Sequence, residues 1–524
     1  MCTLGGINGK PMTAPVPATI GDLLGVQARR RESSPFLHDP AGGRTISFGT
    51  MAAYAGRIEE ELTASGFCPG DRVAIMLQNG VEAAAAILGV MGAGGVVVPI
   101  NPRMTAKETA RILSLSAPLF IIMDGAHRPQ LGTSLDGSWV DLTSHGMPEL
   151  NIRILARLRA VSVARKRGRI GSDSRALILC TSGTTGMPKG VPLSHGNLLA
   201  DASFVRDAHR LAPEDTALCV LPFFHINGLV VTLLAPLLTG MPVVVPDRFR
   251  SDTFWELVAR YGVTWFSGVP TILSLLLSRP DPPAETLRTL RFARSASASL
   301  PVAVLDEFER RFGVPVIESY GISEASAQVT TNPLPPQPHK VGSAGLPVGN
   351  VIAILGENGA PLPVGKTGEV GVAGPNVFGG YLDNPEADRE AFRNGWFHTG
   401  DLGYLDADGY LFLTGRKKEL INRAGEKISP REVEEVIHRL PEVELASVVG
   451  VPHPLYGEEV VAFVIVRPDR EIDAERITGF CREHLAGFKV PKEILFVDDF
   501  PKGPSGKFQR RRLVDVYLTP KGNP

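Results

Sequence analysis

The sequence predicts an α/β protein with parallel sheets in a large N-terminal part and a small α+β unit at its C-terminal end. Three observations predict this architecture. The chain has 524 residues, enough for several folding units. Helix-like and strand-like apolar segments alternate up to about residue 345, and the last hundred residues follow a different order. Because such alternation is typical of βαβ units, we expect the N-terminal strands to be mostly parallel and covered by helices.

The N-terminal third contains this alternation in its clearest form. Segments 71–77, 96–100 and 118–124 are short, β-branched and apolar, and segment 82–94 is alanine-rich and helix-like. Two long uncharged runs, 83–102 and 216–246, raise the question of membrane spans. Each consists of a helix-like stretch followed by a β-branched stretch bounded by proline, so both are interpreted as buried α/β structure.

The second half is expected to continue this pattern and then to change. A strand at 176–180 runs into a glycine-rich loop and a helix that begins near Ser194. Asn-Gly and Pro-Val-Gly turns predict short strands between 351 and 374. Near the C-terminus we expect a helix capped by Ser429 with Pro430 in its first turn, strands at 444–454 and 458–468, and a helix at 474–487.

Composition excludes several classes of protein. Lys plus Arg is 54 and Asp plus Glu is 55, so a net charge of −1 gives no overall attraction for nucleic acid or an anionic membrane. The basic stretch 153–169 is interpreted as a solvated linker or helix face rather than a nucleic-acid patch. Five scattered cysteines without CxxC spacing argue against disulfides or a zinc cluster, and the N-terminus resembles no signal peptide, so a cytoplasmic protein is expected.

The segment TSGTTGMPKG, residues 181–190, carries the strongest chemical signal. Glycines let backbone amides approach phosphate oxygens, while four hydroxyls and one lysine add donors and positive charge. The spacing differs from that of a Walker A loop, but the physics is the same. We therefore expect a phosphate-binding loop made by Thr181, Ser182, Gly183, Thr184, Thr185, Gly186 and Lys189.

This loop resembles the signature of the adenylate-forming superfamily, which contains acyl-CoA synthetases, luciferases and peptide-synthetase adenylation domains. Four further segments resemble that family's motifs in the expected order, and the similarity spans roughly residues 20–515. The segments are ESYGISE at 318–324, GWFHTGD at 395–401, GRKKELI at 415–421 and PSGK at 504–507. The pattern is nearest to that of oxalate-CoA ligases.

The resemblance implies roles for individual residues. Alone, Glu324 would be read as a helix cap, Tyr320 as a packed aromatic, Asp401 as a turn residue and Lys507 as part of a basic surface run. Because these residues occur together, in motifs that follow one another in the family's order, the functional interpretation is favoured. The implied nucleotide-site residues are Ser319, Tyr320 stacking on adenine, Gly321, Ser323 replacing the usual threonine, Glu324 holding Mg²⁺, Asp401 and Arg416 at the ribose, with Thr184 and Lys507 in catalysis.

The resemblance also implies two domains. An ATP- and acid-binding domain would span residues 1–415, and a mobile lid carrying Lys507 would span 416–524, with Lys418 at the hinge. The lid would rotate because Lys507 must approach the phosphates in the first step and a thiol needs that space in the second. Asn422 replaces a lysine found in many aromatic-acid ligases and luciferases, which again favours the oxalate-CoA ligase branch.

Two segments are expected to form the acid pocket. LPFFHINGL at 221–229 resembles the family's aromatic-histidine segment, so His225 would gate the acid site, although a core histidine is the alternative. Asn227 stands where relatives that activate oxalate often have a second histidine. RFARSASASL at 291–300 replaces a glycine-rich segment, so Ser295, Ser297 and Ser299 could donate to a small polar acid; alternatively, some of them cap the helix near Leu300.

These interpretations predict an AMP-forming acid:CoA ligase that uses ATP, Mg²⁺ and CoA to activate a small, polar, oxalate-like acid. One alternative keeps adenylation but passes the acid, or an oxyacid such as nitrite, to an amine or a carrier-protein thiol. Another is a non-catalytic nucleotide-binding scaffold, and the presence of Lys507, Glu324 and Asp401 argues against it.

Overall fold

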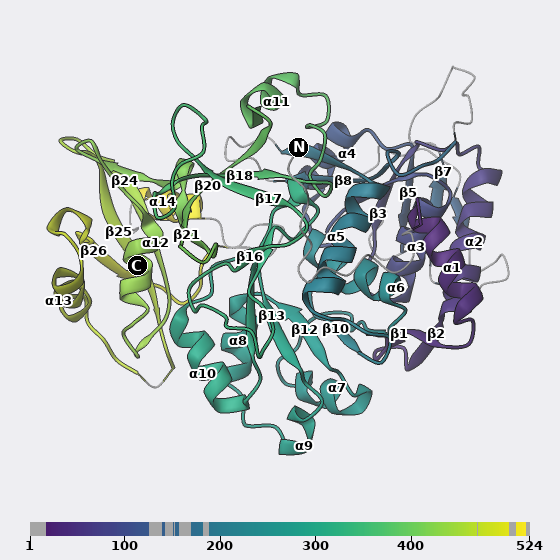
Figure 1. Ribbon diagram of the computed structural model, residues 1–524, viewed down its shortest axis with the longest axis horizontal. Helices are drawn as coiled ribbons and strands as arrows, with labels where there is room; N and C mark the ends of the chain where they lie inside the picture. The colour runs from purple at the N-terminus through teal and green to yellow at the C-terminus, as the bar shows by residue number, and fades with distance from the viewer. Residues whose placement is uncertain are drawn as a thin grey trace.

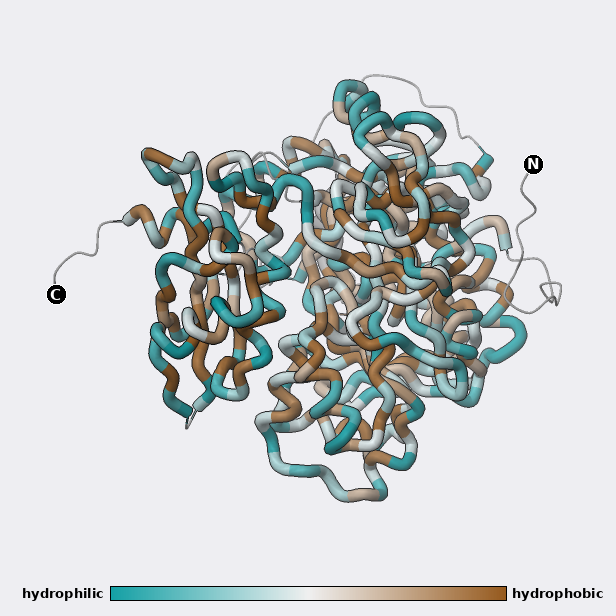
Figure 2. The backbone as a smooth tube through the Cα atoms, turned by 60° about the vertical axis from the view of Figure 1, so that its left-hand side comes forward, coloured by the Kyte–Doolittle hydropathy of each residue, from teal (hydrophilic) through white to brown (hydrophobic). Residues whose placement is uncertain are grey.

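The computed structural model describes residues 17–124, 139–141, 150, 152–156, 169–181, 188–468, 470–501 and 510–519. Four sheets organise these residues. Two large sheets and one antiparallel sheet form the N-terminal body, and the fourth sheet forms a smaller C-terminal part beside it (Figure 1). Hydrophobic segments gather inside both parts, and hydrophilic loops face outward (Figure 2).

The first large sheet has the strand order β6-β7-β5-β3-β4-β8-β9 in the described chain, and its central strands β5, β3, β4 and β8 are parallel. The prediction of parallel strands in the N-terminal third is therefore confirmed. Helix α3 is buried along almost its whole length, which explains the first uncharged run. The strands are β3 Arg72–Met76, β4 Val96–Pro99, β5 Phe120–Met123, β6 Trp139–Asp141, β7 Arg153–Ala156, β8 Arg175–Thr181 and β9 Lys189–Ser194, and the helices α1 Ile20–Arg30, α2 Phe48–Ala64, α3 Val81–Gly92 and α4 Ala106–Ser116.

One detail of this sheet differs from the interpretation of the sequence. The basic stretch 153–169 is not simply a linker or a helix face, because its first four residues form β7, which pairs antiparallel with β5. Residues 157–168 lie outside the described part of the chain. The short apolar run Ile-Leu-Ala is compatible with a strand, and the basic residues around it hide that pattern in the sequence.

The second large sheet has the order β16-β15-β14-β13-β12-β10-β11-β1-β2. One face packs on α5 and α6 and the other on α7, α8 and α10, so the sheet lies between two helical layers. Its strands are β1 Pro35–Asp39, β2 Arg44–Ser47, β10 Ala217–Cys219, β11 Val243–Val244, β12 Trp265–Gly268, β13 Phe292–Ser295, β14 Val316–Tyr320, β15 Thr330–Thr331 and β16 Leu346–Pro347, and the helices α5 His195–Ala208, α6 Ala235–Thr239, α7 Phe254–Tyr261, α8 Pro270–Leu277, α9 Ala284–Leu287 and α10 Val302–Phe312.

The second uncharged run folds as buried α/β structure. It contains β10, a π-helical segment η3 (Asn227–Leu234), α6 and β11, and every residue of η3 is buried. No helix in the described ranges is both long and apolar enough to cross a membrane. Single π-helical turns inside helices are frequent at functional sites, and η3 begins at a residue of the predicted acid pocket.

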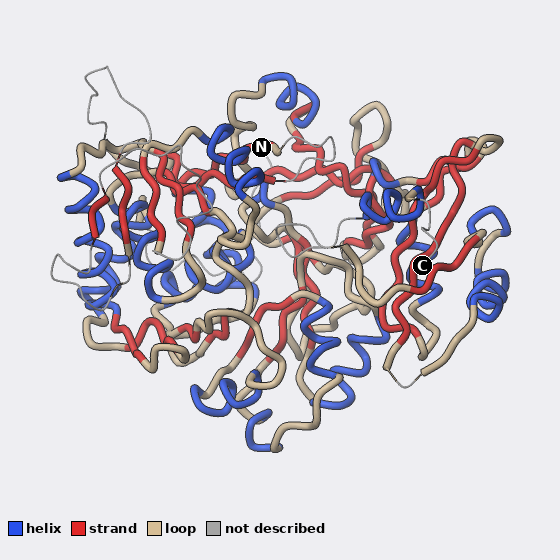
Figure 3. The backbone as a smooth tube through the Cα atoms, turned by 180° about the vertical axis from the view of Figure 1, so that it is seen from behind, coloured by secondary structure: helices blue, strands red, loops and turns tan. Residues whose placement is uncertain are grey.

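The remaining sheets are smaller (Figure 3). An antiparallel sheet joins β17 Val351–Leu355, β18 Gly368–Ala373, β19 Phe392–Arg393, β20 Trp396–Leu405 and β21 Leu411–Arg416, with α11 Pro385–Ala391 beside it. The C-terminal sheet joins β22 Ile421–Arg423, β23 Glu426–Ile428, β24 Val443–His453, β25 Gly457–Val466 and β26 Glu493–Phe496, with α12 Pro430–Ile437, α13 Ala474–His484, α14 Arg510–Leu518 and the 3-10 turns η5 Lys417–Glu419 and η6 Gly487–Lys489.

The C-terminal part confirms the strands and helices expected there, with one correction. Pro430 occupies the first turn of α12 and Ser429 the position before it, as predicted. The Ser429 hydroxyl does not cap the helix, however, because it donates to the backbone carbonyl of Thr414 in β21. This hydrogen bond ties the C-terminal part to the last strand of the N-terminal body.

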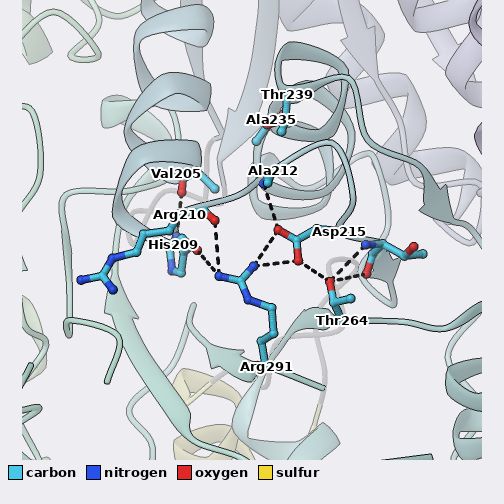
Figure 4. A network of polar contacts seen from close by, with 10 residues as sticks. Val205, His209, Arg210, Ala212, Asp215, Ala235, Thr239, Thr264 and Arg291 are labelled. Carbon is cyan, nitrogen blue, oxygen red and sulfur yellow. Dashed lines mark hydrogen bonds and ion pairs between the residues drawn. The ribbon is translucent and has the colours of Figure 1, made fainter. Parts of the chain in front are cut away.

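The ion pair between Arg291 and Asp215 stabilises the second large sheet where β12 and β13 begin (Figure 4). The guanidinium of Arg291 donates to both carboxylate oxygens of Asp215, at 2.6 and 2.7 Å. Asp215 is buried and also accepts from Thr264 Oγ1 at 2.8 Å and from the backbone N–H of Ala212 at 2.9 Å. These bonds fasten the segment after α5 to the starts of β12 and β13.

We expect the substitution Asp215→Ala to lower the free energy of unfolding by about 1–3 kcal/mol, because it leaves the Arg291 guanidinium and two further donors without their acceptor. The measurement is the apparent melting temperature of purified protein. Arg310→Ala is the matched control, since Arg310 pairs with Glu307 on the surface and its side chain is 70% exposed. Equal decreases in the two variants would contradict a stabilising role for the Arg291 ion pair.

Candidate active site

Two of the predicted nucleotide-site segments begin at the carboxyl ends of strands in the two large sheets. Strand β8 ends at Thr181, whose hydroxyl donates to the backbone carbonyl of Lys189 at 3.3 Å. Strand β14 ends at Tyr320 and is followed by the loop that contains Glu324. Ligands of α/β sheets bind outside such strand ends. Six predicted residues lie outside the described part of the chain: Ser182, Gly183, Thr184, Thr185, Gly186 and Lys507.

The loop after β14 turns so tightly that only glycine fits at its start. A Cβ atom on Gly321 would lie 1.3 Å from the backbone oxygen of Ala327. Ser323 and Glu324 then form the short turn η4 (Ser323–Ala325), and Ser326 follows with a positive φ of 57°. The loop therefore packs closely against its own backbone. This packing fixes the direction in which the Glu324 side chain points.

The buried carboxylate of Asp201 stabilises this loop through hydrogen bonds. Asp201 in α5 accepts from the backbone N–H of Gln328 at 3.1 and 3.2 Å and from Asn376 Nδ2 at 3.1 Å. Asn376 Nδ2 also donates to the carbonyls of Ala325 and Gln328, at 3.0 and 2.9 Å. Burial raises the pKa of Asp201 to about 7, against the lowering effect of these donors. Sequence reasoning missed Asp201 and Asn376; a lone acidic residue on the apolar face of α5 was the available signal.

Glu324 and Lys189 meet at a tyrosine that the motifs did not identify. Tyr381 Oη donates to Glu324 Oε1 at 3.1 Å, and the ammonium group of Lys189 lies 4.6 Å from the centre of the Tyr381 ring. Burial raises the pKa of Glu324, whereas the Tyr381 hydrogen bond lowers it. Tyr381 therefore connects Lys189 of the predicted phosphate loop with the carboxylate expected to hold Mg²⁺.

Three predicted nucleotide residues are brought together between β14, β20 and β21. Tyr320 Oη donates to Asp401 Oδ2 at 2.6 Å, and Arg416 Nε lies 2.8 Å from Asp401 Oδ1. Asp401 and Arg416 are register partners on adjacent antiparallel strands. Burial and the charge of Asp401 raise the pKa of Tyr320, so the phenol stays protonated and donates. The charge of Asp401 likewise raises the pKa of Arg416.

Two other predicted residues, Ser319 and Lys418, form no hydrogen bond or ion pair with the side chains of Tyr320, Asp401 or Arg416 in the described structure. Ser319 is buried in β14 and its hydroxyl is 2.7 Å from that of Thr331, so it serves the interior of the sheet. Lys418 is exposed in the turn η5, between the sheet that ends with β21 and the C-terminal sheet.

The two segments predicted for the acid pocket lie side by side. His225 precedes η3 and its ring lies against Phe224, with centroids 4.8 Å apart. Asn227 begins η3 and its Nδ2 atom donates to Ser297 Oγ at 3.3 Å. Ser297 has a positive φ of 71°, which directs the chain after β13 toward Asn227.

The three serines of this segment have different surroundings. Ser297 faces Asn227, whereas Ser299 is exposed. Ser295 lies at the end of β13 opposite Glu318 in register, and its buried hydroxyl has no hydrogen-bond partner among the described residues. The alternative interpretation as helix caps does not hold for α10, since its N-cap residue is Pro301 and no side chain caps it.

Arg294 is the residue of this segment that sequence reasoning missed. Its side chain lies in the interior, 1% exposed, and Nη1 donates to Asn227 Oδ1 at 3.2 Å and Ser267 Oγ at 3.0 Å. Nη2 donates to Gln328 Oε1 at 3.2 Å. An arginine inside the otherwise apolar strand sequence FARS was the signal that could have identified it.

Two family models match the chain. The model of the AMP-binding enzyme matches residues 24–382, and the model of the AMP-binding enzyme C-terminal domain matches residues 432–507. Both matches include segments from which the resemblance to adenylate-forming enzymes was inferred.

Curated relatives and solved structures agree with these models. The chain is 41% identical over 500 residues to a sulfoacetate–CoA ligase of Cupriavidus necator, covering 95% of this chain and 97% of that one. It is 41% identical over 461 residues to an oxalate–CoA ligase of Arabidopsis thaliana, covering 87% and 90%. The structure of ATP-bound MatB from Rhodopseudomonas palustris superimposes with a TM-score of 0.83 at 32% identity, covering 95% and 99%.

These similarities confirm the predicted α/β architecture of a large N-terminal domain and a small C-terminal domain, and the prediction of an acid–thiol ligase. The chain belongs to the AMP-binding enzyme family.

Proposed function

We propose that this protein is an AMP-forming ligase that joins a small, polar carboxylic acid to CoA. Family membership supports the adenylation chemistry, and relatives named as sulfoacetate– and oxalate–CoA ligases support a small, strongly polar acid. The observation that carries the proposal is the polar lining beside Asn227. A long apolar tail would lie against an amide, two hydroxyls and a buried guanidinium without offering them polar partners, which costs free energy.

The proposed reaction has two steps. A carboxylate oxygen of the acid attacks the α-phosphorus of ATP, and pyrophosphate leaves with the bonding electrons. The sulfur of CoA then attacks the carbonyl carbon of the acyl-adenylate, AMP leaves, and the thiol proton passes to solvent. Negative charge concentrates on the phosphates in the first step, so catalysis depends on positioning and charge stabilisation.

Each group of residues has a role in the proposed reaction. Tyr320, Asp401 and Arg416 hold the nucleoside, and their mutual hydrogen bonds fix the edge of that site. Thr184 and the rest of the loop 181–190 bind phosphates, and Lys507 acts in adenylation, as the family resemblance implies. We assign residues 1–415 to the ATP- and acid-binding domain and 416–524 to a lid that turns at Lys418.

Glu324 is suited to a magnesium ion. It is a half-buried carboxylate whose side chain accepts from neutral Tyr381, and no described lysine, arginine or histidine forms an ion pair with it. Mg²⁺ is commonly held by one or two carboxylates together with substrate phosphates and water. When bound, the ion would neutralise charge on the phosphates of ATP.

Pyrophosphate release tests the proposed function. The acids are oxalate, sulfoacetate, malonate, acetate, benzoate, a twelve-carbon fatty acid and nitrite, each with ATP and Mg²⁺, with and without CoA. We expect turnover with one or more of the small polar acids and formation of its CoA thioester, detected by mass spectrometry. Turnover only with the fatty acid would contradict the pocket assignment, and pyrophosphate release with no thioester would indicate an amine or a carrier protein as acceptor.

The substitution Tyr381→Phe tests the role of Glu324. It removes the hydrogen bond that lowers the pKa of Glu324, so that pKa rises and the carboxylate protonates at higher pH. We expect the acidic limb of the pH–rate profile for Mg²⁺-dependent adenylation to move to higher pH, with rates close to wild type at alkaline pH.

Tyr517→Phe is the control for this experiment. Its hydroxyl also donates to a glutamate, Glu493, at 3.1 Å, but on the exposed surface of the C-terminal part. The Tyr517→Phe profile should coincide with that of the wild type. An unchanged acidic limb in Tyr381→Phe would show that Glu324 does not titrate in the reaction.

A further inference from the structure

Arg294 is a buried cation next to the proposed acid pocket, and the inference drawn from it rests on the proposed function. It lies in the middle of the second large sheet and is one of the largest side chains buried to less than 2% exposure. On β13 its side chain shares a face with Phe292, toward η3 and α5, because side chains alternate along a strand.

The positive charge of Arg294 has no direct counter-charge in the described structure. Its acceptors are an amide oxygen of Asn227, a hydroxyl of Ser267 and an amide oxygen of Gln328, all neutral. No described carboxylate lies within 4.0 Å of it. Asp201 acts on it only at a longer distance, and the oxygens of that carboxylate accept from backbone and amide donors. Burial lowers the pKa of Arg294 to about 10, so the guanidinium remains charged at neutral pH.

Two donors in this cluster lack an acceptor. Arg294 Nε and Gln328 Nε2 are both buried and have no hydrogen-bond partner among the described residues. A buried donor without a partner costs about 1–3 kcal/mol, and native interiors rarely keep two of them together. Unpaired hydrogen-bond donors next to a cation that has no counter-charge form surroundings that suit an anion.

The cluster is in contact with the residues expected to bind the acid. Asn227 accepts from Arg294 through its Oδ1 atom and donates to Ser297 through its Nδ2 atom, so one side chain joins the cation to a serine expected to bind the acid. A short acid seated against Asn227 and Ser297, with its reacting carboxylate toward the nucleotide, directs its other end at this cluster.

We propose that the acid substrate carries a second anionic group, and that Arg294 selects for it by balancing its charge, directly or through Asn227. The substrate class is a short dianionic acid, with two carboxylates or with a carboxylate and another acidic group. Arg294 is then a specificity-determining residue, and an acid of the same shape without the second anionic group leaves its charge unmatched.

Isosteric pairs of acids test this proposal. Malonate is compared with malonamate, and oxalate with oxamate; each pair differs in one carboxylate replaced by an amide. The measured quantity is the ratio of kcat/KM values within a pair, from pyrophosphate release with CoA present. We expect the wild type to prefer at least one of the dianions. Arg294→Met should lower that preference at least about thirtyfold, and Arg294→Lys should retain much of it.

Arg291→Met is the matched control, because Arg291 lies three residues earlier and pairs with Asp215 away from Asn227. It should leave the ratio unchanged. If Arg294→Met does not fold, Asn227→Asp supplies the test, since a carboxylate 3.2 Å from Nη1 would neutralise the cation and lower the ratio in the same way.

Two results would overturn the proposal. One is an equal loss for both members of each pair in Arg294→Met or Asn227→Asp, which would assign Arg294 a purely structural role. The other is a wild-type preference for the amides or for other acids that carry a single negative charge. In that second case CoA thioesters would still form, so the proposed ligase function would stand; absence of pyrophosphate release and thioester with every acid would instead overturn the function itself.

Discussion

The buried carboxylate of Asp201 is the contact on which the geometry of the active site depends. It lies in α5, yet its donors belong to the loop after β14 and to the segment after β18. A carboxylate in the interior is stable only where donors surround it, so these three distant pieces of chain have one favourable arrangement. Glu324 takes its position from that arrangement, because the carbonyl of its neighbour Ala325 accepts from Asn376 and its own carbonyl accepts from the backbone N–H of Phe378.

Gln328 connects the predicted nucleotide site with the predicted acid site. Its backbone N–H donates to Asp201, its carbonyl accepts from Asn376, and its side-chain oxygen accepts from Arg294. One residue therefore fixes both the loop that carries Glu324 and the cation near the acid pocket. Adenylation needs the carboxylate and the α-phosphorus within reach of each other, and a shared rigid support reduces the entropy lost in aligning them.

Periodicity and motifs predicted the parts of this protein that local sequence determines. The strands β3, β4, β5 and β8, and the fully buried α3, follow from apolar runs bounded by turns. The resemblance implied that Asp401 and Arg416 both contact the ribose, and the register of β20 with β21 places the two residues opposite each other. Tyr381 and Asp201 were not predicted, because each acts through contacts with chain more than fifty residues away. The serines of the segment RSASAS looked equivalent in sequence, but β13 ends at Ser295, whereas Ser297 lies beyond the strand with a positive φ.

Arg291 and Arg294 lie three residues apart, yet one is paired with a carboxylate and the other with neutral oxygens only. Arg291 is bound at both oxygens of Asp215, so its charge is cancelled and its contribution is to stability. Arg294 is solvated by neutral oxygens of Asn227, Ser267 and Gln328, whose dipoles stabilise the guanidinium without cancelling its net charge. On the proposed function, its field acts on a bound acid in a medium of low dielectric constant, where a charge interacts more strongly than in water. A carboxylate at any of these three positions would have made the interior more stable and the pocket indifferent to the charge of its ligand. On the proposed function, the neutral partners keep the cation available for the substrate.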